Sequence, residues 1–133
     1  KGNVKGDFFA CPDGLAFDPA GRLWICTDIG PTALNKGEMA RIANNQLLAC
    51  DVASGEIRRF LTGPVNCEIT GPAFTPDGRT LFLNIQHPGE TPSERSDPDQ
   101  PRRWSNWPDF SPTGRPRSAT LAIRRVDGGV VGT

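Results

Sequence analysis

The sequence predicts an all-β protein built from antiparallel four-stranded sheets, the blades of a β-propeller. Three observations predict this fold class: apolar runs of strand length alternate with turn sequences, one nine-residue segment occurs twice, and no capped helical period is present. The 15 Gly and 13 Pro together make up 28 of the 133 residues, which favours short strands and turns over long helices.

The first half of the chain predicts one complete blade, residues 14–61. Four apolar runs follow one another as two hairpins, and the turn of each hairpin contains a glycine that can adopt a positive φ. Val, Ile, Leu and aromatic residues occupy the strand positions. The strands predicted for this blade are residues 14–18, 22–28, 46–52 and 56–61.

A second unit begins where a segment of the first blade recurs. Gly14–Arg22 reads GLAFDPAGR and Gly71–Arg79 reads GPAFTPDGR, with six identities in nine positions at an offset of 57 residues. Recurrence of a strand meander is typical of β-propellers, whose blades surround a central channel. This unit predicts strands at 71–75, 80–86 and 118–126 but no fourth strand. We therefore expect the chain to be an internal or processed piece of a longer protein, about its last two blades.

A Pro-rich insertion, residues 87–117, interrupts the second unit. It holds seven of the 13 prolines and ten charged residues, a composition that excludes a helix or an inner strand. A surface loop is the simplest expectation for a segment of this kind. Its aromatic residues Trp104, Trp107 and Phe110 indicate that part of it packs on the rest of the protein, as a lid would.

The charge balance and the motifs exclude several classes of function. With 15 basic and 15 acidic residues the net charge is zero, so the chain is not a uniformly basic nucleic-acid binder. No stretch approaches the roughly 18 apolar residues of a membrane span. The sequence contains neither a glycine-rich phosphate loop nor a zinc-type pair of cysteines. Cys26 and Cys50 lie in apolar runs, where we expect buried thiols.

The start of the innermost strand of each blade is the expected place for function, because these positions meet at the channel mouth. Asp13 and Glu68 each stand just before such a strand, at equivalent places in the two repeats. Converging carboxylates need a counter-charge, and a cation that takes oxygen ligands supplies it. Asp77 lies in the outer hairpin turn and is assigned to that turn. The single histidine, His87, cannot form a catalytic triad within this chain and is either a ligand or a strand-end residue.

Four segments together resemble the C-terminal part of PhoX-type alkaline phosphatases. The resemblance implies a six-bladed propeller with a cluster of iron and calcium ions that hydrolyses phosphate monoesters. It also implies a bacterial protein exported in the folded state by the twin-arginine route, to the periplasm or beyond. The segments are CPDGLAFDPAGRLWICTD (11–28), TGPVNCEITG (62–71), FTPDGRTLFLNIQHPGE (74–90) and RPRSATLAIRRVDGG (115–129).

The resemblance implies Glu68 as the first metal ligand and Asp13 as the second, since similar lactonases hold a metal at the Asp13 position. Asn66, Asn84 and His87 are expected near the phosphate. The other ligands are expected in the remaining blades of the parent chain, so we expect this piece alone to be inactive. Two alternatives stay open: a metal-dependent lactonase propeller of the regucalcin or gluconolactonase kind, and a non-catalytic propeller used for interaction.

Overall fold

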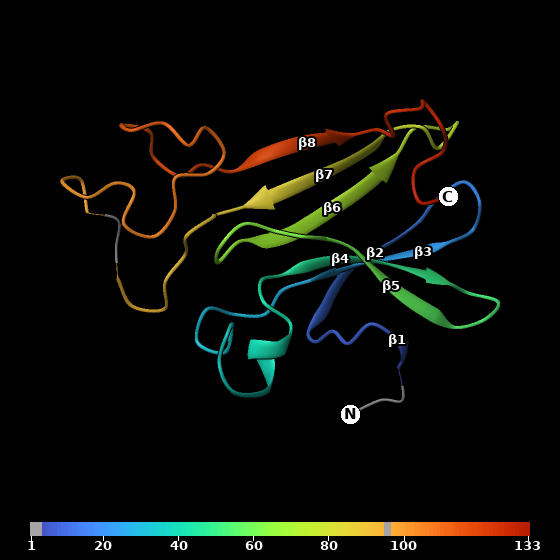
Figure 1. Cartoon of the computed structure of the whole chain (residues 1–133), viewed down its shortest axis with the longest axis horizontal. Helices are drawn as coiled ribbons and strands as arrows, with labels where there is room; N and C mark the ends of the chain where they lie inside the picture. The colour runs from blue at the N-terminus through green and yellow to red at the C-terminus, as the bar shows by residue number, and fades with distance from the viewer. Residues whose placement is uncertain (1–3, 95–96) are drawn as a thin grey trace.

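The computed structural model describes residues 4–94 and 97–133, which form two β-sheets packed on each other (Figure 1). The first sheet has the strand order β1-β5-β4-β3-β2, and its strands β2 to β5 form an antiparallel meander that we call the first blade. Its strands are β1 (Lys5–Gly6), β2 (Pro12–Phe17), β3 (Leu23–Thr27), β4 (Gln46–Asp51) and β5 (Glu56–Thr62).

The second sheet, here called the second blade, has the order β6-β7-β8 and is antiparallel throughout. Its strands are β6 (Glu68–Phe74), β7 (Leu81–Gln86) and β8 (Ala119–Ile123). A short 3₁₀ helix, η1 (Gly37–Arg41), lies in the loop between β3 and β4. The prediction of an all-β chain of antiparallel blades is therefore confirmed.

The structure corrects several details of the predicted strands. The two-residue strand β1, which pairs in parallel with β5, was not predicted because Lys5 and Gly6 show no apolar alternation. Strands β2 and β6 begin at Pro12 and Glu68, earlier than the apolar runs that predicted them. Strand β8 ends at Ile123, shortly before the turn that a hydrogen bond from the Gly128 N–H to the Arg125 carbonyl closes, rather than at residue 126.

The main core lies between the two blades. Alternate residues of strand β7 are buried, and they pack against the first blade. A smaller cluster around Leu48 covers the opposite face of the first blade under Phe9. Cys26 and Cys50 are buried as expected, and Cys67 is buried as well. The main core comprises Trp24, Cys26, Leu47, Cys67, Ile69, Leu81, Leu83, Ile85 and Val131.

The inner hairpins of the two blades match in register and differ by one residue in their turns. Ala16 pairs with Trp24 in the first blade as Ala73 pairs with Phe82 in the second, and each hairpin has an irregularity at its glycine. In the second blade this glycine, Gly71, has a φ of 62°, and a side chain there would meet the Asn84 amide. The second turn is one residue longer, so the repeat offset is 57 before the turn and 58 after it.

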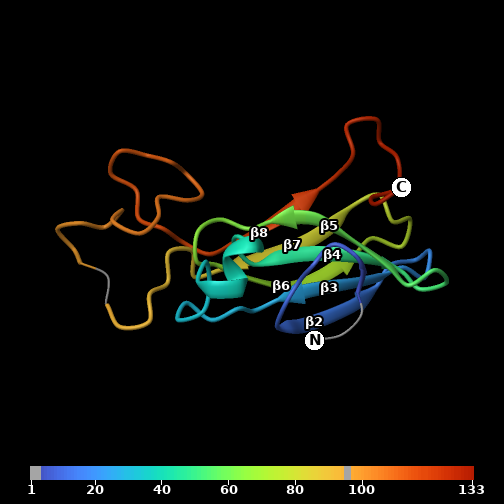
Figure 2. The same ribbon diagram turned by 60° about the horizontal axis from the view of Figure 1, so that its bottom comes forward.

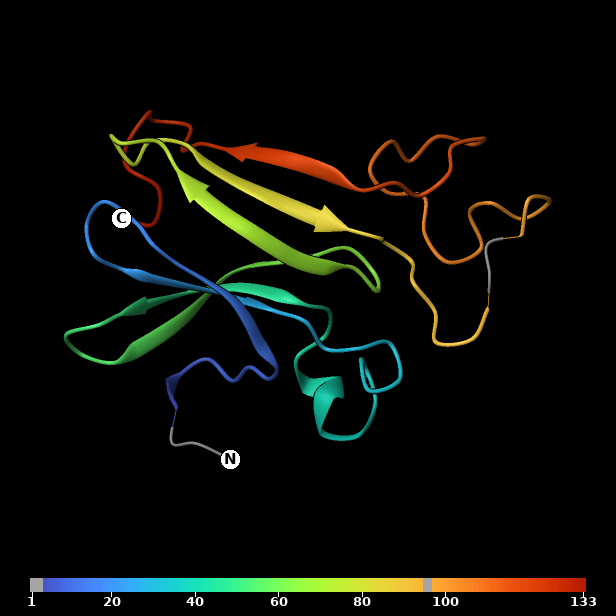
Figure 3. The same cartoon turned by 180° about the vertical axis from the view of Figure 1, so that it is seen from behind.

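The insertion projects from the end of the sheets at which β7 ends and β8 begins (Figures 1 and 3). Its residues 95 and 96 lie outside the described part. In the rest no helix or strand is found, as predicted. Trp107 packs against the main core, whereas Phe110 is 67% exposed. No helix among the described residues has the length and apolar character needed to cross a bilayer.

Candidate functional site

Glu68 and His87 come together at one end of the second blade. Glu68 is the first residue of β6 and pairs with Gln86, the last residue of β7, so the residue that follows β7 lies beside it. Its Oε2 accepts a hydrogen bond of 2.7 Å from Gln86 Nε2 and lies 3.3 Å from His87 Nε2. The Glu68 side chain is only 15% exposed. The structure thus joins two of the predicted site residues.

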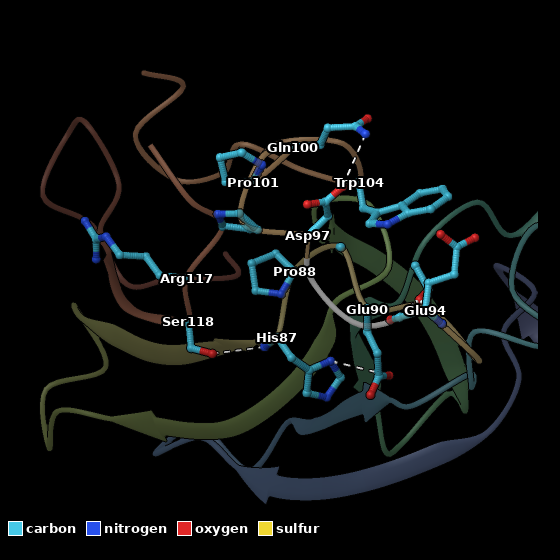
Figure 4. A pocket seen from close by; sticks show the side chains of 13 residues that line it. His87, Pro88, Glu90, Glu94, Asp97, Gln100, Pro101, Trp104, Arg117 and Ser118 are labelled. Carbon is cyan, nitrogen blue, oxygen red and sulfur yellow. Dashed lines mark hydrogen bonds and ion pairs between the residues drawn. The ribbon is translucent and has the colours of Figure 1, made fainter. Parts of the chain in front are cut away.

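The far side of the His87 ring faces a second carboxylate, Glu90. His87 Nδ1 lies 3.5 Å from Glu90 Oε2 (Figure 4), and it is a buried nitrogen without a well-formed hydrogen bond. The backbone N–H of His87 donates to Ser118 Oγ at 3.0 Å, which fixes the residue between β7 and β8. Glu68, His87 and Glu90 form a row that we call the carboxylate–imidazole row.

Asn66, another predicted site residue, holds the loop that carries Glu90. Its Nδ2 donates to the Glu90 carbonyl at 2.9 Å, and the Glu90 N–H donates back to the Asn66 carbonyl at 3.2 Å. Asn66 itself has a φ of 52°, a conformation that asparagine tolerates better than most residues. The reciprocal pair of hydrogen bonds therefore sets the place of the Glu90 carboxylate. In this structure Asn66 is a positioning residue.

Asp13 reaches the same end of the molecule from the first blade. It lies on β2 at the irregularity opposite Cys26. Burial raises the pKa of the Cys26 thiol to about 12, and the negative charges of Asp13 and Glu68 add to the rise. Both carboxylates therefore lie near one buried thiol. Burial, and to a smaller extent Glu68, likewise raises the pKa of Cys67 to about 12.

The two carboxylates do not occupy equivalent positions, which corrects the expectation from sequence. At the offset of 57 residues Glu68 corresponds to Cys11, and Asp13 corresponds to Thr70. Both lie within strands β6 and β2 rather than just before them. The apolar runs in the sequence indicate the regular part of each strand. The pairing of each strand with its neighbour begins earlier in the chain.

Asn84 and Asp77 lie apart from the carboxylate–imidazole row. Asn84 is in the middle of β7, opposite Thr70, and its Oδ1 accepts a hydrogen bond of 2.7 Å from Thr120 Oγ1. Asp77 is confirmed as a turn residue between β6 and β7. Its Oδ1 accepts from Thr75 Oγ1 at 2.6 Å and from the Arg79 N–H at 3.0 Å, which lowers the pKa of Asp77.

A pocket of about 480 Å³ lies within the insertion, with His87 at its wall (Figure 4). Glu90, Glu94 and Asp97 line it with Trp104, so it combines carboxylates with one aromatic ring. Arg117 also lines it, but its guanidinium is held by Asp109 at 2.9 and 3.0 Å. The pocket is open beside the row and could receive a small organic group.

Within residues 4–94 and 97–133, no three His, Cys, Asp or Glu side chains come together in a way that could hold a metal ion. The row explains part of this, because the imidazole of His87 stands between the carboxylates of Glu68 and Glu90. The carboxylate oxygens are suitable ligands for calcium or iron, but in this chain they form at most part of a coordination shell.

Sequence reasoning missed two residues of this site, Glu90 and Asn45. Glu90 could have been noticed because it follows the lone histidine by three residues. Asn45 is 2% exposed and holds two loops together: its Oδ1 accepts from the Ile29 N–H at 2.7 Å, and its Nδ2 donates to the Cys67 carbonyl at 2.9 Å. In the sequence, the one indication of its role is that it is a polar residue directly before a buried strand.

Comparison with known proteins places these features in a family context. The family model for the alkaline phosphatase PhoX matches residues 1–89. The solved structure of Pseudomonas fluorescens PhoX in complex with vanadate, a transition state analogue, is similar with a TM-score of 0.76 and 51% sequence identity. The match covers 91% of this chain and 19% of that chain, so the chain spans about a fifth of this relative. No curated protein matches significantly.

Proposed function

Because this chain belongs to the PhoX family of alkaline phosphatases, we propose that it is the C-terminal part of a metal-dependent enzyme that hydrolyses phosphate monoesters. The observation that carries the proposal is that Asp13 and Glu68 lie on β2 and β6, strands of the two blades that contact each other, so that both negative charges act on the buried Cys26 thiol. Vanadate, bound by the Pseudomonas fluorescens relative as a transition state analogue, resembles a phosphoryl group in transfer. The family match favours this reaction over lactone hydrolysis.

In the proposed site Glu68 and Asp13 supply oxygen ligands to calcium and iron ions. Such ions polarise the phosphoryl oxygens and activate the nucleophile when they are bound. The hydrogen-bond contacts described for Glu68 both go to Oε2, from Gln86 and His87, so Oε1 is the oxygen that we assign to a cation. Oriented carboxylate ligands of this kind are usual around protein metal sites.

The residues around Glu68 have supporting roles in this proposal. His87 orients Glu68 on one side and faces Glu90 on the other, and Asn66 fixes the Glu90 loop. We also propose His87 and Asn66 as residues that contact the phosphate. Asn84 is a weaker candidate for that contact, because its amide oxygen is taken up by Thr120.

The pocket beside His87 is the proposed place for the alcohol part of the ester. It is bounded by the insertion, so the insertion would shape the choice of substrate. The remaining ligands would come from the blades that make up the rest of the parent chain, and the isolated piece would be inactive. We further propose export to the periplasm or beyond, as the resemblance implies.

The test uses the intact protein with Glu68→Gln, which removes a charged oxygen ligand and keeps nearly the same shape. We expect loss of iron or calcium and a fall in p-nitrophenyl phosphate turnover of at least roughly 100-fold, at or beyond the upper range for residues that only support a ligand. Asp13→Asn should act in the same direction but more mildly, because an amide oxygen can still coordinate.

Asp77→Asn is the matched control, since it changes a carboxylate to an amide in an exposed turn distant from the site. Its turnover and metal content should equal those of the unchanged protein. The proposal is wrong if Glu68→Gln keeps its full metal content and activity, or if Asp77→Asn impairs turnover as strongly. Hydrolysis of a sugar lactone in place of the phosphate ester would favour the lactonase alternative.

A further inference from the structure

Trp104 lies in the wall of the pocket that we propose for the alcohol part of the ester (Figure 4). Among the described residues that line this pocket it is the one tryptophan or phenylalanine, and it is 37% exposed. His87 and Glu90 line the same pocket, so a group bound against the Trp104 ring lies beside the carboxylate–imidazole row. An aromatic ring in such a place offers a large apolar surface for a bound group to cover. The contacts of Trp104 therefore bear on which alcohol the pocket accepts.

The Trp104 ring is held by a cation that lies outside the pocket. The guanidinium carbon of Arg103 lies 4.6 Å from the ring centroid, and Arg103 Nη1 lies 3.3 Å from Glu94 Oε2. A cation over an aromatic face is attracted to it, and Arg103 is not among the residues that line the pocket. The guanidinium thus orients the ring without filling the space beside it. A ring oriented before the ligand arrives binds with a smaller loss of conformational entropy.

The backbone at Trp104 rests on Gly89, where a side chain would displace it. Gly89 has a φ of 85°, and its N–H donates to the Val65 carbonyl at 2.8 Å. A Cβ atom at Gly89 would lie 2.9 Å from the Cβ of Ser105 and 3.3 Å from the carbonyl carbon of Trp104. Because glycine has no side chain, the segment Trp104–Ser105 can lie directly against the loop that follows β7.

The segment that carries Trp104 is also tied to the main core, although much of the insertion extends beyond the ends of the strands (Figure 2). Ser105 Oγ accepts a hydrogen bond of 3.2 Å from the Trp107 N–H, and Trp107 packs against the main core. The Trp107 carbonyl accepts a hydrogen bond of 3.2 Å from the Arg117 N–H, which joins this segment to the end of the insertion. Trp104 therefore belongs to a wall that is fixed on the second blade.

The polar groups of the pocket narrow the chemistry of the ligand. Glu90 and Asp97 line it with carboxylates, which only accept hydrogen bonds when they are ionised. The guanidinium of Arg117 is already paired with Asp109. A second negative charge on the alcohol part would be repelled by the carboxylates. We propose that Trp104 determines substrate specificity, so that the pocket prefers phosphate esters whose alcohol part carries an uncharged aromatic ring over esters of small alkyl alcohols.

This inference rests on the proposed function and names the class of alcohol within it. The test compares benzyl phosphate with ethyl phosphate in the intact protein, because both are esters of primary alcohols and benzyl phosphate alone carries a ring. We expect kcat/KM to be about 10-fold higher for benzyl phosphate, which is the effect of burying one ring against another. Trp104→Ala should lower this ratio to about 2 or less, whereas Trp104→Phe should keep most of it because an aromatic contact remains.

Two further variants have matched controls. Phe110→Ala removes an exposed aromatic ring of the same insertion that does not line this pocket, so it should leave the ratio of the two kcat/KM values unchanged. Gly89→Ala should lower the ratio, because the new Cβ displaces the segment Trp104–Ser105. Gly55→Ala is its control, since it adds a Cβ at a similar φ but in open space.

The outcomes separate this inference from the proposed function. If the unchanged protein hydrolyses both esters equally well, or if Trp104→Ala leaves the ratio as it is, the inference is overturned while the phosphatase proposal stands. An equal fall of the ratio in Phe110→Ala would also overturn it, because that ring lies outside the pocket. A protein that hydrolyses neither ester would instead overturn the proposed function, and this inference with it.

Discussion

The ring of Trp24 in β3 lies 5.1 Å from the ring of Phe74 in β6, measured between centroids, with 51° between the two planes. Trp24 also meets Phe60 of β5 edge to face at 4.9 Å, and its Nε1 donates to Asp18 Oδ2 at 3.0 Å. One fully buried side chain therefore joins the second blade, the outer strand of the first blade and the turn of its inner hairpin. Packing between the blades depends on this contact.

Trp24→Ala should lower the free energy of unfolding of the intact protein by about 3–5 kcal/mol, the usual cost of removing a buried aromatic side chain. Trp24→Phe should lower the free energy of unfolding by less, because it keeps most of the packing and loses mainly the hydrogen bond to Asp18. Urea unfolding followed by circular dichroism measures both. Trp104→Ala is the control on the insertion, where the ring is 37% exposed, and an equal loss there would contradict the assignment.

Asn45→Asp should displace the segment that leads into Glu68. The Asn45 amide nitrogen donates to the carbonyls of Ile29 and Cys67, and a carboxylate oxygen in its place would repel both. A buried polar group left without a hydrogen-bond partner lowers the free energy of unfolding by about 1–3 kcal/mol, and by more when it is charged. We expect weaker metal retention as well as lower stability, because Asn45 holds the Cys67 carbonyl directly before Glu68.

The matched change for this prediction is Asn35→Asp, on an exposed asparagine of the same loop between β3 and β4. Metal content after dialysis and urea unfolding should be measured for both variants. Asn45→Asp should lose metal and stability together. If it loses stability while its metal content and metal affinity stay unchanged, Asn45 supports the fold only and does not position the site.

The buried thiols predict how stability changes with pH. Their pKa values are about 12 for Cys26 and Cys67 in the folded protein, against 9.0 for an ordinary thiol. Below pH 9 both thiols are protonated in either state and the full stability is present. As pH rises from 9 towards 12 the unfolded chain loses these protons first, so stability falls by about 1.4 kcal/mol per pH unit for each thiol.

Unfolding free energies at pH 8 to 10.5 test this slope in the intact protein. Cys26→Ala should reduce the decline, whereas Cys11→Ala should leave it unchanged because Cys11 is exposed. Alkylation gives an independent readout: at pH 8 we expect iodoacetamide to label Cys11 rapidly and Cys26 and Cys67 only after unfolding. Rapid labelling of Cys26 in the folded protein would contradict its burial.

The isolated 133-residue chain is expected to associate with itself or with other segments of its parent. Arrays of stacked repeat units generally need about three or more repeats for stability, and this chain has two blades. In the described part of the chain β8 pairs with β7 alone, and its other edge lies near exposed apolar side chains, among them Phe110 and Phe82. Analytical ultracentrifugation at low micromolar concentration measures the association. A well-folded monomer under these conditions would contradict the expectation.

The sequence was sufficient to predict the blades, because each inner hairpin carries a turn signal and an apolar run that act locally. The repeat at Gly14 and Gly71 marked both hairpins and placed Asp77 in its turn. The contact of Glu68 with His87 could not be predicted, because it depends on the pairing of β6 with β7 across 19 residues. The same limit applies to Asn45, whose partners come from two separate loops.

The staggered positions of the two carboxylates have a use beyond this chain. In each blade the Gly-x-Ala-Phe tetrapeptide marks the inner strand, and Glu68 stands three residues before it while Asp13 stands one residue before it. In the first blade the residue three positions before the tetrapeptide is Cys11, and in the second blade the residue one position before it is Thr70. If the proposed metal site is correct, acidic side chains at either of these two offsets in other blades are expected near the same site. Locating this tetrapeptide along the parent polypeptide therefore yields a short set of acidic positions for mutagenesis in the remaining blades.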